Sequence, residues 1–167
     1  MDTLVQTTPA IPKRVDTSAL PDAPIGDAPE VAMLAGNRRL AALWEHMAAA
    51  LDSQPWLPSA ALEAARSRTA TMHGLSWAAT PVPIGDPLVQ ACVAVAEMFV
   101  ADVHAVTDDM AARVVDLAGP EAFTTLAAAL AIWEGIYRLA ATWGWEPPDR
   151  RASHPAHGLG PTTSPVT

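Results

Sequence analysis

Apolar residues in the middle of the chain recur at steps of three and four positions, which is the spacing of one face of an α-helix. The first such run extends from Glu30 to Leu51 and is interrupted by the proline-containing segment 52–58. A second run follows Pro58, and Ser59 stands where a helix N-cap is expected. The pattern therefore predicts two helices in the first half of the chain.

Residues that favour helix ends divide the second half of the chain into three further helices. Asp86 followed by proline suits the start of a helix over 87–103, which is apolar on nearly every side and is therefore expected to lie centrally. Thr107 is expected to cap a short helix that stops at Gly119. The last predicted helix begins at the next proline and ends near residue 143.

The composition agrees with an all-helical fold. Half of the 167 residues are hydrophobic, alanine is abundant and β-branched residues are comparatively few. We expect one all-α domain, a bundle of about five to six helices over residues 30–146. Residues 1–29 are rich in proline and glycine and are predicted to form an extended arm, and residues 147–167 are predicted to form a disordered tail.

The charge balance argues against several classes of partner. The formal net charge is −8 and the pI is about 4.9, which disfavours binding to nucleic-acid phosphates. The longest apolar stretch, 123–143, contains Glu134 and Arg138, so no segment is expected to span a membrane. The first ten residues, MDTLVQTTPA, lack the apolar core of a secretory signal, and a cytoplasmic location is therefore expected.

Cys92 is the only cysteine, and it lies in the apolar context VQACVAVAEMF. Two interpretations are open: a buried and inert thiol, which the apolar neighbours favour, or a reactive thiol, which would need a cationic neighbour that this segment lacks. No His or Cys spacing typical of a metal site occurs, and neither does a phosphate-binding loop or a nucleotide fingerprint. No metal and no cofactor are therefore expected.

The segment 62–79, LEAARSRTATMHGLSWAA, is the most informative part of the sequence. It resembles the active-site helix of the alkylhydroperoxidase D and carboxymuconolactone decarboxylase family, which reads Glu, a run of Arg and small apolar residues, then Asn-Gly-Cys-x-x-Cys and a His. The residues that match are Glu63, Arg66, Arg68 and Gly74. Leu75 and Ala78 occupy the two cysteine places and Val82 the histidine place, so the thiol chemistry of the family is not expected here.

A second resemblance to the same family lies in the last predicted helix. There the family has a long helix that ends in a pattern like Trp-Asn-x-x-x-Arg-x-x-x-x-x-Gly. Trp133, Arg138 and Gly144 stand at the matching places, and Glu134 stands where Asn is common. The similarity as a whole extends over about residues 30–146. It implies an alkylhydroperoxidase D-like bundle that assembles as a homo-oligomer, a trimer or a dimer-based hexamer.

The resemblance also implies a pocket between the two matching helices, with Glu63 as a candidate catalytic residue. His73, where the family usually has Asn, is the second candidate, because a His beside a carboxylate can form an acid–base pair at neutral pH. Glu63 would act as a general base in a dry pocket, with His73 as its acid–base partner. The alternatives are an ordinary ion pair between Glu63 and Arg66, and a His73 that ends its helix by bonding a backbone carbonyl. The candidate substrate-binding residues, for which packing in the core or at a subunit interface is the alternative, are Trp77, Leu75, Ala78, Trp133 and Tyr137.

These residues suggest a divergent carboxymuconolactone decarboxylase-like protein. It is expected to act without redox cysteines on a small, largely apolar organic molecule, by acid–base chemistry such as isomerisation, cyclisation or decarboxylation, with secondary metabolism as one setting. The alternative is a catalytically inactive homologue that binds a ligand or serves as an oligomeric scaffold. The expected partners are a small organic molecule and further copies of the same chain, with no nucleic acid and no membrane.

Overall fold

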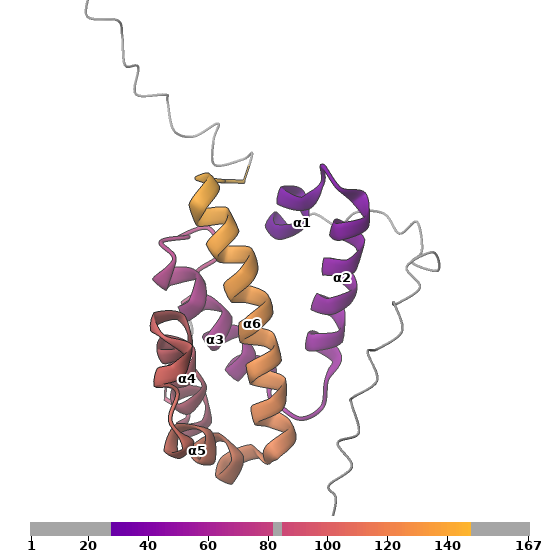
Figure 1. Ribbon diagram of the computed structural model, residues 1–167. Coiled ribbons are helices and arrows are strands. Elements are labelled where there is room, and N and C mark those ends of the chain that lie inside the picture. The colour runs from indigo at the N-terminus through magenta and orange to yellow at the C-terminus, as the bar shows by residue number, and fades with distance from the viewer. Residues whose placement is uncertain (1–27, 82–84, 148–167) are drawn as a thin grey trace, which may run out of the picture.

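A computed structural model describes residues 28–81 and 85–147, and the regular elements within these ranges are all helical (Figure 1). The predicted all-α class and the expected number of helices are thereby confirmed. The predicted arm over 1–29 and tail over 147–167 lie outside the described ranges, apart from their innermost residues. The elements are α1 (Pro29–Leu34), α2 (Arg38–Ser53), α3 (Ser59–Met72), α4 (Pro87–Ala101), the 3-10 turn η2 (Val103–Ala105), α5 (Asp108–Ala118) and α6 (Pro120–Trp143).

The first predicted helix is in fact two helices, α1 and α2, separated by residues 35–37. Asn37 adopts an extended backbone, and its side-chain oxygen accepts a hydrogen bond of 3.2 Å from the backbone N–H of Leu40. An Asn that caps in this way stabilises a new helix start, and residues 36–39, Gly-Asn-Arg-Arg, interrupt the apolar pattern. The expectation of one continuous helix from Glu30 to Leu51 is therefore wrong at this point.

Most other helix boundaries fall where the capping residues predict. Asp86 and Thr107 accept hydrogen bonds from backbone N–H groups at the starts of α4 and α5. Ser59 does not act as an N-cap, because Pro58 takes that position and Ser59 becomes the first residue of α3. α4 ends at Ala101 rather than at residue 103, and a short 3-10 turn follows it.

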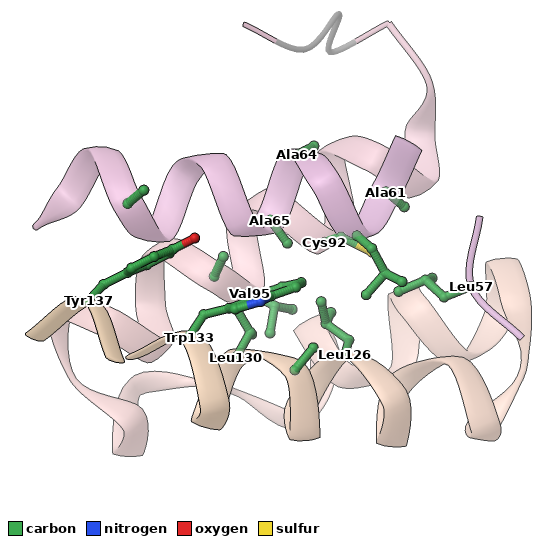
Figure 2. Packing of buried hydrophobic residues seen from close by; sticks show 14 of the residues in the cluster. Leu57, Ala61, Ala64, Ala65, Cys92, Val95, Leu126, Leu130, Trp133 and Tyr137 are labelled. Atoms are coloured by element: carbon green, nitrogen blue, oxygen red, sulfur yellow. The ribbon is translucent and has the colours of Figure 1, made fainter. Parts of the chain in front are cut away.

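The centre of the molecule is the contact of α3 with α4 and α6. The buried face of α3 carries mainly small side chains, whereas α6 contributes large ones. Small residues opposite large ones let two helices approach closely and still fill the space between them. Figure 2 shows large side chains on the face of α6 that is turned toward α3: Leu126, Leu130, Trp133 and Tyr137.

α1 and α2 pack against each other and lie beside the long helix α6, on the side away from α4 and α5 in Figure 1. We call them the α1–α2 unit. Few of their residues are buried: Glu30 and Val31 in α1, and Ala41 and Trp44 in α2. The apolar surface that joins this unit to the bundle is therefore limited, and the buried Glu30 gives its attachment a polar component.

Candidate functional site

A cluster of charged and polar side chains joins α1, α3 and α6, and Arg66 lies at its centre. Arg66 and Glu63 are three positions apart on α3, so their side chains lie on the same face of the helix. The guanidinium donates two hydrogen bonds to the Glu63 carboxylate, from Nε to Oε2 at 2.8 Å and from Nη2 to Oε1 at 2.7 Å. Such a pair of parallel charge-assisted hydrogen bonds fixes both side chains in one orientation.

Glu30 of α1 and Tyr137 of α6 complete this group, which we call the Arg66 cluster. Arg66 Nη1 donates to the Tyr137 hydroxyl at 2.8 Å and to Glu30 Oε1 at 3.5 Å. The Tyr137 hydroxyl in turn donates to the same Glu30 oxygen at 3.0 Å. Tyr137 is fully buried, and its pKa is raised by that burial first and by the charge of Glu30 second. The hydroxyl therefore keeps its proton and serves as a donor.

A cleft of about 340 Å³ opens beside the Arg66 cluster, between α2 on one side and α3 and α6 on the other. Its volume lies in the lower part of the range of roughly 300–1,000 Å³ that is typical of small-molecule sites. Trp44, Leu62 and Trp133 give it apolar and aromatic walls, and Glu30 and Glu63 lie among its polar lining. It therefore combines the two features of a ligand site, apolar walls and a few fixed polar groups.

Two other hollows have a different character. One of about 480 Å³ lies between α4 and α5, and one of about 320 Å³ lies beside α3 and residues 79–81. Neither is lined by an aromatic side chain. Size alone would favour the first of them, but the cleft beside the Arg66 cluster brings aromatic walls together with buried polar groups, and we regard it as the candidate site.

Of the predicted site residues, Glu63 and Trp133 line this cleft, and His73 lies elsewhere. His73 follows α3 directly, ten positions after Glu63, which corresponds to about 15 Å along a helix axis. Its Nε2 lies 2.6 Å from Glu134 Oε2 on α6, and Arg138 donates to the other oxygen of that carboxylate. The structure thus separates the two candidate catalytic residues and gives each a charged partner of its own.

The remaining predicted substrate-binding residues belong to the core. Leu75 and Ala78, in the places of the family's two cysteines, are buried, and Tyr137 has no exposed surface. The Trp77 ring packs edge-on against Tyr137, at 6.1 Å between ring centroids, and against Trp145, at 5.2 Å. Contacts of this kind are ordinary aromatic packing, the alternative that the sequence left open for these side chains.

The pKa of Glu63 is lowered from its ordinary value of 4.5, chiefly by the hydrogen bonds from Arg66. Partial burial acts in the opposite direction but is the smaller influence. A general base that works near neutral pH usually needs a raised pKa. The Glu63 carboxylate is therefore better suited to hold a charge in place than to take up a proton.

The lowered pKa of Glu63 predicts an acid-sensitive contribution to stability. A carboxyl group whose pKa is lower in the folded state stabilises the fold fully above its unfolded-state value, here 4.5, and less as the pH falls through the folded-state value. We therefore expect the stability of Glu63→Gln to fall less than that of the wild type as the pH is lowered through 4.5 and below. Urea unfolding followed by circular dichroism measures this difference.

The control for this experiment is Asp116→Asn, which removes an exposed carboxylate of α5. This variant should retain the acid dependence of the wild type. If Glu63→Gln also retains it, the Glu63–Arg66 pair contributes nothing that depends on the charge of Glu63.

Cys92 is buried in α4, as its apolar context predicts. Burial, assisted by the charge of Asp86, raises the pKa of the Cys92 thiol to about 11. The thiolate is the reactive form of cysteine, so this environment is that of an inert structural thiol. Within residues 28–81 and 85–147, no three His, Cys, Asp or Glu side chains are grouped so that they could hold a metal ion.

Two residues that line the cleft, Glu30 and Trp44, were not identified as site residues from the sequence. Outside the cleft, Glu134 was noted as a departure from the family pattern, but its contact with His73 spans 61 positions and has no local signal. The Glu63–Arg66 pair, by contrast, was among the alternatives, because three-residue spacing on a helix is visible in sequence.

Comparisons with known protein families, with curated proteins and with solved structures find no match to this chain. No helix in the described part of the chain is both long and apolar enough to cross a membrane.

Proposed function

We propose that this protein binds a small, largely apolar organic molecule in the cleft between α2 and the α3–α6 pair. The observation that carries the proposal is the combination of Trp44 and Trp133 as walls with the Arg66 cluster as a fixed polar boundary. Apolar surface supplies most of the binding free energy in such sites, at about 25 cal/mol per Å² buried, and the polar groups fix orientation.

The relationship to the alkylhydroperoxidase D and carboxymuconolactone decarboxylase family is retained as part of this proposal. The packing of the helix that carries Glu63 against the helix that carries Trp133 is compatible with it. Assembly into a trimer or hexamer also remains a proposal. It finds support in exposed large side chains such as Leu40 and Met47 on one face of α2, and the solution mass from light scattering would test it.

A second candidate function is acid–base catalysis at the His73–Glu134 pair, which lies apart from the cleft, by isomerisation, cyclisation or decarboxylation. The contact of His73 with Glu134 favours it, because a carboxylate that holds an imidazole in one orientation is a recurrent arrangement for a general base. A ligand that is converted by the wild type and returned unchanged by His73→Gln would support this candidate. A ligand that every variant returns unchanged would leave binding as the function.

The cleft itself is tested by filling it. Ala48 of α2 lines the cleft, and Ala48→Phe should abolish or weaken, by at least about tenfold, the binding of small apolar compounds. We expect compounds found by ligand-observed NMR screening against the wild type to lose their signal with this variant.

Ala50→Phe is the matched control, because Ala50 lies on the same helix, is exposed and does not line the cleft. It should bind the same compounds as the wild type. Compounds that bind equally well to Ala48→Phe and to the wild type occupy another part of the molecule, and the proposal for this cleft would then fail.

A further inference from the structure

The charged residues that line the cleft are mostly acidic. They are Glu30, Asp52, Glu63 and Arg66, which together carry three formal negative charges and one positive charge. The whole chain, at a formal charge of −8, adds a background potential of the same sign. A ligand that enters the cleft therefore meets a negative environment.

Arg66 has little capacity left for an anionic ligand. Its guanidinium makes four hydrogen bonds within the Arg66 cluster, and a guanidinium has only five N–H donors. A carboxylate or phosphate group that took two of these donors would have to displace Glu63, Glu30 or Tyr137, and it would add a further negative charge to the cleft. An anionic ligand is therefore disfavoured, although an arginine lines the site.

Glu30 is the carboxylate of the cleft that is least well compensated for its burial. Its side chain is only 9% exposed, and its nearest opposite charge, the Arg66 guanidinium, lies 3.5 Å away, compared with 2.7 and 2.8 Å for Glu63. Its closest partner is a neutral group, the Tyr137 hydroxyl, at 3.0 Å. Burying a charge is costly unless an opposite charge lies close by. A cation in the cleft would supply that compensation, and a neutral ligand would not.

The aromatic walls suit the same kind of ligand. Trp44 and Trp133 both line the cleft, and the face of an indole ring attracts a cationic group through its quadrupole. Leu51 and Leu62 line the cleft as well and offer apolar surface for the remainder of a molecule. The lining thus provides for a positive group and for an apolar body.

From the charge, the occupied donors of Arg66 and the aromatic walls, we infer that the ligand is a small organic cation, an amine with an aromatic or branched aliphatic body. Its ammonium group lies toward the carboxylates and against the face of one tryptophan, and its body packs against the rest of the apolar lining. This inference rests on the proposed function, because it names the class of ligand for the same cleft.

Three probes of similar size and different charge test the inference by isothermal titration calorimetry: phenethylamine, 2-phenylethanol and 3-phenylpropionate. We expect phenethylamine to bind about tenfold more tightly than 2-phenylethanol, through one ion pair and one cation–π contact, and 3-phenylpropionate to bind most weakly. Added salt should weaken the binding of the amine and leave that of the alcohol unchanged.

Asp52→Asn removes one charge from the cleft at an exposed position and should reduce the preference for the amine over the alcohol by about threefold. Asp116→Asn, an exposed change on α5 outside the cleft, should leave that preference intact. These two variants separate a local charge effect from a change in the net charge of the chain.

The possible outcomes distinguish the inference from the function on which it rests. A preference for the amine below about threefold, or tighter binding of the carboxylate, overturns the inference and leaves the binding function standing. The same holds if none of the three probes binds while other compounds bind in a manner sensitive to Ala48→Phe. If no compound of any charge binds in that manner, both the inference and the proposed function fail.

Discussion

Replacing Arg66 with methionine is expected to lower the free energy of unfolding by about 2–3 kcal/mol. The substitution keeps an unbranched apolar stem but removes every hydrogen bond that Arg66 donates to Glu63, Glu30 and the Tyr137 hydroxyl. Breaking a fully buried ion pair costs more, about 3–5 kcal/mol, but the Arg66 side chain is 25% exposed, so water replaces part of what is lost. Urea unfolding followed by circular dichroism measures the change.

The loss should be concentrated in α1. Glu30 attaches this short helix to α3 and α6 through Arg66 and Tyr137. Without the guanidinium, its carboxylate would be buried beside a single hydroxyl, and moving α1 into water becomes favourable. We therefore expect amide hydrogen exchange in α1 to accelerate more than exchange in α6.

Arg68→Met is the matched control for this prediction. Arg68 lies two positions further along α3, and its ion pair with Glu97, at 2.7 Å, joins side chains that are 42% and 37% exposed. Exposed pairs of this kind contribute at most about 1 kcal/mol. If both methionine variants lose the same small amount of stability, the Arg66 cluster is no more than a surface ion pair, and it does not hold the α1–α2 unit in place.

The fold could be predicted from the sequence because nearly every helix boundary has a local cause. Asp86, Thr107 and Gly119 each act within a few residues of their own position, by capping a helix or by ending it in a conformation that favours glycine. The break before α2 was missed although it too has a local cause. Gly36 and Asn37 favour a turn and a new helix start, and no apolar side chain lies between Ala35 and Leu40.

The site was predicted less well because its interactions connect distant parts of the chain. Within the Arg66 cluster, Arg66 meets a carboxylate 36 positions away and a hydroxyl 71 positions away, and the contact between Glu30 and Tyr137 spans 107 positions. Spacing on a single helix reveals only the pair of Glu63 and Arg66. The family pattern directed attention to the two cysteine places, after the end of α3. Leu75 and Ala78 occupy these places and are buried in the core. The cleft lies instead toward the start of α3.

Trp133→Ala is expected to have the largest effect of the substitutions considered, a loss of about 3–5 kcal/mol in the free energy of unfolding. Trp133 is 6% exposed and extends from α6 into the contact with α3 (Figure 2). It also forms part of the wall of the cleft. Truncation removes the apolar contacts of the indole and leaves a void that the neighbouring alanines of α3 are too small to fill. The same void would enlarge the cleft, so binding of small apolar compounds should weaken as well.

Trp143→Ala provides the control on the same helix and with the same change of side chain. Trp143 is the last residue of α6 and is 62% exposed, so its truncation should alter stability by no more than about 0.5 kcal/mol and leave ligand binding unchanged. Chemical denaturation of the two variants separates the effect of burial from that of losing a tryptophan. Similar losses in both would mean that α6 does not pack its Trp133 face against α3. If Trp133→Ala is destabilised but still binds the same compounds at wild-type affinity, Trp133 packs in the core as described but is not part of the ligand site.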